Sequence, residues 1–223
     1  MIFRIDEHSH HFLLQHMVNA GYAGSNIEAV REHVKELSTL GVAAPNTVPT
    51  FYPVPLQQLT QAEMIQVPHD CTSAEVEYVN LFIAGKHYIS VGSDHSDRAL
   101  EGYSVASAKQ ICPNIISDEL WEYSEVADHL HQVVLKCEVG FEDKWIVYQQ
   151  GTLSDLLTPD LLMQYGAAVM PAHRDGLVVY SGTIPLVGDI IYSDQWRVSM
   201  HDEVSGRKMS KEYEVEVLPP SIT

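Results

Sequence analysis

Three acidic side chains lie at the ends of two neighbouring apolar runs. Glu75 and Glu77 precede or open the run 78–84, and Asp94 follows the run 88–91. In an extended strand, residues i and i+2 face the same side, so Glu75 and Glu77 project together. If the two runs form a hairpin, the end of the second run returns Asp94 to the same corner. The spacing therefore predicts a cluster of three carboxylates.

Two carboxylates at this spacing repel each other unless one is protonated or a cation lies between them. Three carboxylate oxygens with waters make a site suited to Mg²⁺, Mn²⁺ or Ca²⁺, with positions left open for a substrate. Zinc is disfavoured because no histidine or cysteine falls at a matching spacing. The alternative is that the glutamates begin an exposed strand and diverge into solvent.

The composition indicates a soluble globular protein with an acidic surface. Of 223 residues, 45% are hydrophobic and 19% are charged, which is typical of a chain with a well-filled core. Lys and Arg total 13 against 30 acidic residues, which gives a formal net charge of -17. Such a surface repels nucleic acid and anionic lipid. An anionic substrate remains possible if a cation or local Lys and Arg reverse the field in the site.

The cysteine pattern and the N-terminal segment indicate a cytoplasmic protein. Cys71, Cys112 and Cys137 are odd in number and widely spaced, which favours reduced thiols. The first residues, "MIFRIDEHSHHFLL", contain acids and histidines where a signal peptide has a basic patch and a long apolar stretch. No apolar run approaches the roughly 20 residues of a membrane-spanning helix. The histidine tract itself is interpreted as a solvated edge.

The first 58 residues are predicted to form an N-terminal segment with one helix that packs on a main domain of residues 59–223. Apolar residues at helical spacing predict the helix within 25–42, with Ser25 or Asn26 as its cap and Gly41 after its end. The proline-rich stretch 45–55 must be extended or looped, and it links the two parts.

After residue 59, short apolar runs separated by Gly, Pro, Asn or Asp predict strands. The last of them, "KEYEVEVL", alternates acidic and apolar residues with the period of a half-exposed strand. Helices are expected at 104–111, 118–132 and 157–166. The predicted class is α+β, predominantly β, with a mixed or antiparallel sheet. The predicted strands are 64–67, 78–84, 88–91, 133–139, 145–149, 177–180, 189–192 and 213–218.

Four motifs in order resemble the fumarylacetoacetate hydrolase superfamily. They are "EVE" at Glu75–Glu77, "SDHSDR" at Ser93–Arg98, Lys109 in "SAKQICP", and "VVYSGTIPLVGDII" at Val178–Ile191. The resemblance covers roughly residues 74–191. The chain is most similar to an uncharacterised compact bacterial family, a domain of unknown function, that is related to these hydrolases.

This resemblance implies a mixed β-roll or β-sandwich with a few helices and a divalent ion bound by Glu75, Glu77 and Asp94. Mg²⁺ is the preferred cofactor, with Mn²⁺ or Ca²⁺ as alternatives. It also implies a homodimer and a small-molecule carboxylate substrate, a 2-oxo or 2,4-dioxo acid. The implied reactions are C–C bond hydrolysis, decarboxylation, hydration and isomerisation, which share a metal-stabilised enolate.

The same resemblance implies roles for the remaining motif residues. Lys109 would supply a second positive charge to the developing oxyanion, and Arg98 would order its turn or pair with a substrate carboxylate. His95, next to Asp94, is the candidate base, although adjacent residues of an extended chain face opposite sides. The substrate-binding residues would be Ser181, Gly182 and Thr183.

The chain departs from the family pattern in three ways. The spacings from Glu77 to Asp94 and from Asp94 to Lys109 are tighter than in the larger members. The usual "GTPxGVG" stretch is "GTIPLVGD", which is shorter and lacks the glycine-rich end. The His–Glu pair with which hydrolytic members activate water has no counterpart that can be assigned residue by residue. Enolate chemistry, unlike hydrolysis, does not depend on this pair. The leading hypothesis is a divalent-metal-dependent hydrolase or lyase that acts on a small oxo acid through an enolate. The alternative is a non-catalytic protein that binds oxo acids or regulates through them on the same fold.

Overall fold

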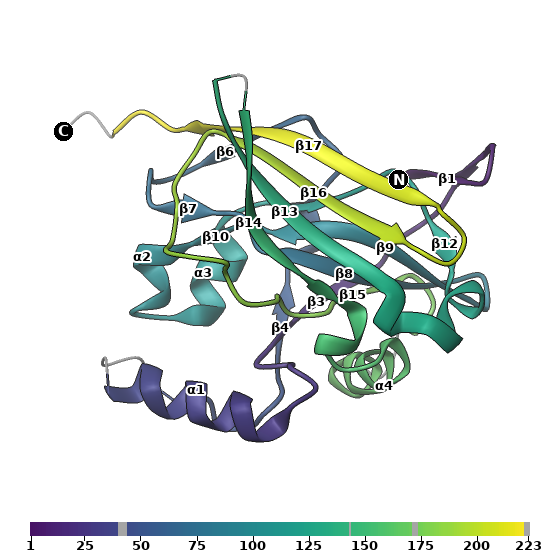
Figure 1. Ribbon diagram of the computed structural model, residues 1–223, viewed down its shortest axis with the longest axis horizontal. Coiled ribbons are helices and arrows are strands. Elements are labelled where there is room, and N and C mark those ends of the chain that lie inside the picture. Colours follow the sequence, from purple (N-terminus) through teal and green to yellow (C-terminus); the bar gives the residue numbers. More distant parts are fainter. Residues whose placement is uncertain (40–43, 143, 171–173, 221–223) are drawn as a thin grey trace.

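Two β-sheets packed face to face frame the molecule in the computed structural model, which describes residues 1–39, 44–142, 144–170 and 174–220 (Figure 1). The larger sheet has the order β4-β3-β15-β8-β9-β11-β5, and β12 also pairs with β9. Its strands are β3 (His16–Gly21), β4 (Thr50–Val54), β5 (Leu59–Thr60), β8 (Val76–Ile83), β9 (Lys86–Asp94), β11 (Asn114–Ile116), β12 (Trp121–Glu122) and β15 (Leu177–Tyr180).

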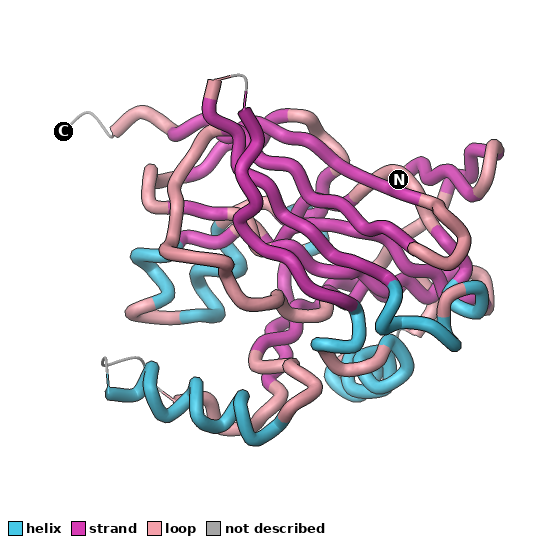
Figure 2. The backbone as a smooth tube through the Cα atoms, viewed as in Figure 1, coloured by secondary structure: helices cyan, strands magenta, loops and turns pink. Residues whose placement is uncertain are grey.

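The smaller sheet has the order β14-β13-β16-β17-β6. Most strand pairs in the two sheets are antiparallel, but β3 with β15, β5 with β11, and β6 with β17 are parallel. The predicted mixed, predominantly β architecture is thus confirmed (Figure 2). The strands of this sheet are β6 (Met64–Val67), β13 (Val133–Phe141), β14 (Lys144–Thr152), β16 (Gln195–Asp202) and β17 (Lys208–Val217).

Helices and short strands border the two sheets. The α-helices are α1 (Ile27–Thr39), α2 (Arg98–Glu101), α3 (Val105–Ile111) and α4 (Pro159–Val169). Four 3-10 turns lie at Leu56–Gln58, Tyr123–Glu125, Ala127–Gln132 and Leu153–Asp155. The two-stranded sheets are β1 (Ile2–Ile5) with β2 (His8–His11), and β7 (Thr72–Ser73) with β10 (Ser96–Asp97).

The central hairpin of β8 and β9 is apolar on both faces because both faces are covered. Tyr78 and Val91 point between the sheets, where they join one buried cluster with Leu135 of β13. Val79 and Leu81 point to the other face and belong to a second buried cluster. A strand buried on both faces reads as a continuous apolar run, which is the pattern in the sequence.

The turn of this hairpin sets the register of the two strands. Ala84 and Gly85 form a two-residue loop, and both have positive φ, 52° and 78°. This is the backbone of a type I′ turn, whose twist matches that of paired strands. The resulting register places Glu77 opposite Gly92, at the far end of the hairpin from the turn.

The N-terminal helix has the predicted cap. The Asn26 side-chain oxygen accepts hydrogen bonds from the backbone N–H groups of Glu28 and Ala29, both at 3.2 Å. These bonds satisfy two N–H groups that the first turn of a helix leaves unpaired. The glycine predicted to follow the helix, Gly41, lies outside the described residues.

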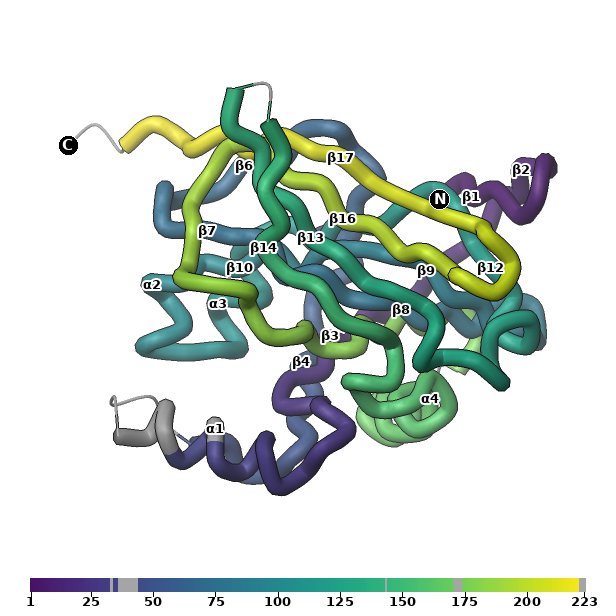
Figure 3. Tube along the Cα trace, viewed as in Figure 1, coloured from purple at the N-terminus to yellow at the C-terminus, as the bar shows by residue number. Residues whose placement is uncertain are grey.

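Strands from both sides of the predicted boundary at residue 58 join the larger sheet. β3 and β4 come from the first 58 residues, and β3 pairs with both β4 and β15. Figure 3 shows β3, near the start of the chain, in the same sheet as β15, which comes more than 150 residues later and pairs with it. The described part of the N-terminal segment therefore contributes to the sheet as well as a helix, and the domain boundary stays a prediction.

Two predicted elements are wrong. Residues 118–132 do not form one helix; they form β12 and two 3-10 turns, because Trp121 pairs with Ile89 of β9. The predicted strand 189–192 is a loop without ladder pairing. Ile190 and Tyr192 are exposed, whereas Ile191 is partly buried against the core between the sheets.

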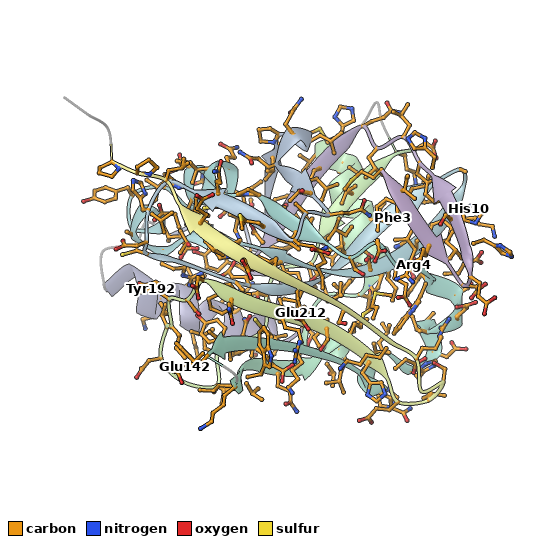
Figure 4. The ribbon with its side chains drawn as sticks, turned by 90° about the horizontal axis from the view of Figure 1, so that it is seen from above. Phe3, Arg4, His10, Glu142, Tyr192 and Glu212 are labelled. Atoms are coloured by element: carbon orange, nitrogen blue, oxygen red, sulfur yellow. The ribbon has the colours of Figure 1, made fainter. Side chains whose placement is uncertain are left out.

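The N-terminal histidine tract lies on a surface hairpin, as expected for a solvated edge. Phe3 on β1 is fully buried, whereas every residue of β2 is exposed. Figure 4 shows Phe3, Arg4 and His10 together at one end of the molecule. Among the described residues, no helix is both long and apolar enough to cross a membrane.

Candidate metal centre

The structure brings the three predicted carboxylates together at the end of the hairpin. One oxygen from each of Glu75, Glu77 and Asp94 lies within 4.8 Å of the others. The backbone N–H of Asp94 donates to the Glu75 carbonyl at 3.1 Å, which holds the two strand ends side by side. Glu77 and Asp94 have no exposed surface, and Glu75 is 9% exposed. The predicted convergence is confirmed, and the reading of these residues as solvated glutamates is wrong.

The donor set fits a hard divalent cation. Two oxygens on opposite sides of Mg²⁺ or Ca²⁺ are about 4–5 Å apart, so the three carboxylates can close on one ion. The Glu77 Oε2 atom accepts the Gly182 N–H at 2.7 Å. Its Oε1 atom is buried and has no hydrogen-bond partner among the described residues. A buried carboxylate oxygen without a partner is costly, and a bound cation would satisfy it.

Two basic side chains balance part of the buried negative charge. The Lys109 ammonium donates to Asp94 Oδ2 and, at 3.3 Å, to Glu75 Oε2. The Arg98 guanidinium donates through Nη1 to Glu75 Oε1. Two short helices position these groups: Asp97 caps α2 by accepting the Leu100 N–H at 2.9 Å, and Lys109 is carried by α3.

The pKa shifts follow from burial and from these neighbours. Burial alone would raise the pKa of Glu75, but Lys109 and Arg98 lower it below its usual value. Burial and then the charge of Asp94 raise the pKa of Glu77 well above its usual value. Burial also raises the pKa of Asp94, against the effect of Lys109. Burial would lower the pKa of Lys109, but Asp94 and Glu75 raise it, so the ammonium stays charged.

The "SGT" segment lies against the start of β8, where Gly182 contacts the cluster. Gly182 has φ +81°, a conformation that side chains disfavour, and this backbone aims its N–H at Glu77. The Thr183 hydroxyl donates to the Val76 carbonyl at 2.9 Å and accepts from Gln149 Nε2 at 2.8 Å. The buried Ser181 hydroxyl donates to the Gly182 carbonyl at 2.8 Å. These hydroxyls therefore shape the segment in this structure.

His95 lies on the opposite side of the backbone from Asp94. Its ring is fully buried between the sheets, with Nδ1 3.0 Å from the Tyr213 hydroxyl and Nε2 2.9 Å from the Thr72 hydroxyl. Burial lowers the pKa of His95 to about 3. Both ring nitrogens are thus engaged by hydroxyl groups in the core.

Three further polar residues border the cluster and were missed by sequence reasoning. Asn114 Nδ2 donates to Asp94 Oδ1 at 3.3 Å. Asn19 is fully buried on β3 beside Asp94, and its amide opposes the rise in the pKa of that carboxyl. Glu101 ends α2 and accepts from Arg98 Nη1 at 3.2 Å. The sequence signal for Asn19 is a polar residue inside the apolar run "HMVNA", which indicates a buried amide. No sequence pattern marks Glu101.

Solved structures with a similar fold define its class. A yeast protein, ynq8, of the fumarylacetoacetate hydrolase family is similar with a TM-score of 0.63 at 14% identity, over 94% of this chain and 96% of that one. A 2-keto-3-deoxy-D-arabinonate dehydratase, solved with magnesium and 2,5-dioxopentanoate, gives a TM-score of 0.66 at 15% identity, over 92% of this chain and 74% of that one. The fold is that of the fumarylacetoacetate hydrolase superfamily.

The family model that describes a "Protein of unknown function (DUF2848)" matches residues 20–213. The chain belongs to this family. A search of curated protein sequences finds no match.

Proposed function

We propose that this protein is a divalent-metal-dependent hydrolase or lyase that acts on a small 2-oxo or 2,4-dioxo acid. The observation that carries the proposal is the buried convergence of Glu75, Glu77 and Asp94 beside the Lys109 ammonium. Mg²⁺ is the preferred ion, with Mn²⁺ or Ca²⁺ as alternatives, because all the ligands are hard oxygens. The similar fold of a dehydratase solved with magnesium and a dioxo acid supports this assignment.

A divalent ion at this site would polarise the adjacent carboxylate and keto oxygens of the substrate and stabilise its enolate. Lys109 would add a second positive charge near the keto oxygen as negative charge develops there. Arg98 would bind the substrate carboxylate, since its Nε atom is buried and has no partner among the described residues. The Gly182 N–H would hold Glu77 in its ligating position.

Backbone groups of Ser181 and Gly182 and the Thr183 side chain would complete the substrate pocket. C–C hydrolysis, decarboxylation, hydration and isomerisation of such acids all proceed through the enolate, so the proposal covers this group of reactions. The alternative function is a non-catalytic oxo-acid binding or regulatory protein. It would use the same residues to bind a ligand and would give no turnover.

The metal site is tested by thermal unfolding with and without Mg²⁺ or Mn²⁺. At a free ion concentration of 100 Kd, binding adds about 2.7 kcal/mol of stability, which raises the Tm of a domain of this size by about 5–10 °C. Glu77→Gln should remove this response. The matched control is Glu212→Gln on the exposed face of β17 (Figure 4). The Glu212 side chain is 59% exposed, and this variant should respond like the wild type.

The substrate class is tested with oxalate, which mimics the enolate of a 2-oxo acid. The wild type should bind oxalate by calorimetry only in the presence of the metal ion, and it should turn over oxaloacetate or an acylpyruvate. Binding without turnover of any oxo acid would support the alternative function. Metal binding that survives Glu77→Gln would overturn the assignment of the site.

The proposal also includes a homodimer in the cytoplasm, with a small carboxylate as substrate and no nucleic-acid or membrane partner. The net charge of -17 supports the last point, because such a surface repels other polyanions. Light scattering coupled to size exclusion measures the oligomeric state directly.

A further inference from the structure

Glu101 lies next to the carboxylate cluster without belonging to it. It is the last residue of α2, and its Oε1 atom accepts from Arg98 Nη1 at 3.2 Å. The same Nη1 atom donates to Glu75 Oε1. One guanidinium therefore joins Glu101 to a proposed metal ligand. Among the described residues, no hydrogen bond reaches the second oxygen of Glu101.

Side-chain exposure increases from the buried cluster toward Glu101. The side chain of Asp94 is fully buried, and that of Lys109 is 7% exposed. The exposed fraction of the side chain alone then rises to 12% for Glu75, 18% for Arg98 and 23% for Glu101. A group at this position can exchange protons with water while it faces the buried carboxylates.

The surroundings of Glu101 favour a carboxyl group that changes its protonation state near neutral pH. Burial, followed by the charge of Glu75, raises the pKa of Glu101 to about 7, against the effects of Arg98 and Lys109. An acid–base group is most effective when its pKa lies near the working pH. The titratable and charged groups that act on it or are affected by it are Glu75, Asp94, Arg98, Lys109, Cys112, Tyr22 and Tyr52.

The other candidates for proton transfer are less free to take part. Lys109 donates to two carboxylates that keep it protonated. His95 has both ring nitrogens bonded in the core between the sheets. Arginine is effectively always charged in proteins, so Arg98 does not cycle a proton.

We propose that Glu101 is the proton-transfer group of this site. The Glu101 carboxylate removes a proton from the carbon next to the keto group of the bound oxo acid. The C–H electron pair becomes the C=C bond of the enolate, the keto π electrons move to the keto oxygen, and Glu101 becomes the carboxylic acid. In the reverse direction Glu101 returns the proton to carbon. This inference rests on the proposed function and adds to it the identity of the acid–base residue.

The test separates proton transfer from binding. In D₂O with Mg²⁺ and 2-oxobutanoate, NMR follows the replacement of the C3 hydrogens by deuterium. Glu101→Gln should slow this exchange at least a hundredfold, the usual contribution of a general acid–base group, and the wild-type rate should fall below pH 7. Calorimetry should show Mg²⁺ and oxalate affinities within about threefold of the wild type, which is a readout independent of activity.

Two further variants serve as controls. Glu125→Gln changes another carboxylate that pairs with an arginine, Arg207 at 2.6 Å. The Glu125 side chain is 46% exposed and contacts no member of the cluster, so this variant should exchange like the wild type. Glu101→Asp keeps the carboxyl group and should restore part of the rate. Thermal unfolding of each variant shows whether the protein is folded.

Each remaining outcome has a distinct meaning. If the wild type binds Mg²⁺ and oxalate and exchanges deuterium, but Glu101→Gln exchanges within threefold of it, the role of Glu101 is overturned and the proposed function stands. Wild-type binding without any exchange also overturns the role of Glu101 and supports the binding protein. If the wild type binds no Mg²⁺, both proposals are overturned.

Discussion

Replacement of Lys109 by methionine should strongly destabilise the metal-free protein. The Lys109 side chain is 7% exposed, and its ammonium donates to both Asp94 and Glu75. Methionine fills a similar volume, so the main change is the loss of the positive charge among buried carboxylates. Removing one partner of a buried ion pair costs about 3–5 kcal/mol. For a domain of this size, that cost lowers the Tm by roughly 10 °C.

The assay is urea and thermal unfolding in EDTA, repeated with excess Mg²⁺. The Mg²⁺-dependent gain in stability should be larger in Lys109→Met than in the wild type, because an ion replaces the missing positive charge. The control is Lys86→Met, which removes a lysine that pairs with Glu122 but is 58% exposed. Exposed pairs contribute about 0–1 kcal/mol. A loss below about 1 kcal/mol for Lys109→Met in EDTA would refute this account of charge balance.

Two other substitutions test the core around the hairpin. Burial lowers the pKa of His87 to about 4, so the folded state favours the neutral ring. The neutral ring's contribution to the free energy of unfolding is fully present above pH 6.5 and is lost as the pH falls to 4. The comparison variant is His87→Gln, whose amide can still reach Asn80. In urea unfolding, the wild type should lose about 2 kcal/mol more of its free energy of unfolding over that pH range than the variant, after a discount for partial exposure. Parallel curves of stability against pH would contradict this. A Cβ at Gly92 would lie 2.3 Å from the Ile115 carbonyl and 2.9 Å from a Val79 methyl, so Gly92→Ala should lower the Tm by about 6 °C or more. Gly188→Ala, which meets nothing within 4 Å, is its control, and equal Tm values for the two variants would show that the strands shift freely.

Local patterns in the sequence predicted the part of the site that one hairpin builds. Period-two spacing placed Glu75 and Glu77 on one face, and the turn at Gly85 returned Asp94 to them. The helix cap at Asn26 and the alternating burial of β17 were predicted for the same reason. In each case the residues that interact are near in sequence, so their spacing alone determines which side chains meet.

Patterns were misleading where a distant partner decides the structure. The segment 118–132 has apolar residues at helical spacing, yet Trp121 pairs with Ile89 and forms a strand. Residues 189–192 have the apolar composition of a strand, but they form no ladder with any strand in the described part of the chain. The strand that supplies the backbone hydrogen bonds lies in another part of the chain. A short stretch of sequence contains no information about that partner.

The sequence by itself therefore determined the predominantly β class, the hairpin and the three convergent carboxylates, because these depend on side-chain period and one turn. Only the tertiary structure decided what surrounds them. It buried His95 between the sheets, placed Asn19 from the N-terminal segment beside Asp94, and put Glu101 at the more exposed side of the cluster. Those positions depend on which strands and helices pack together, and that packing sets the burial and charge on which the chemistry of the site depends.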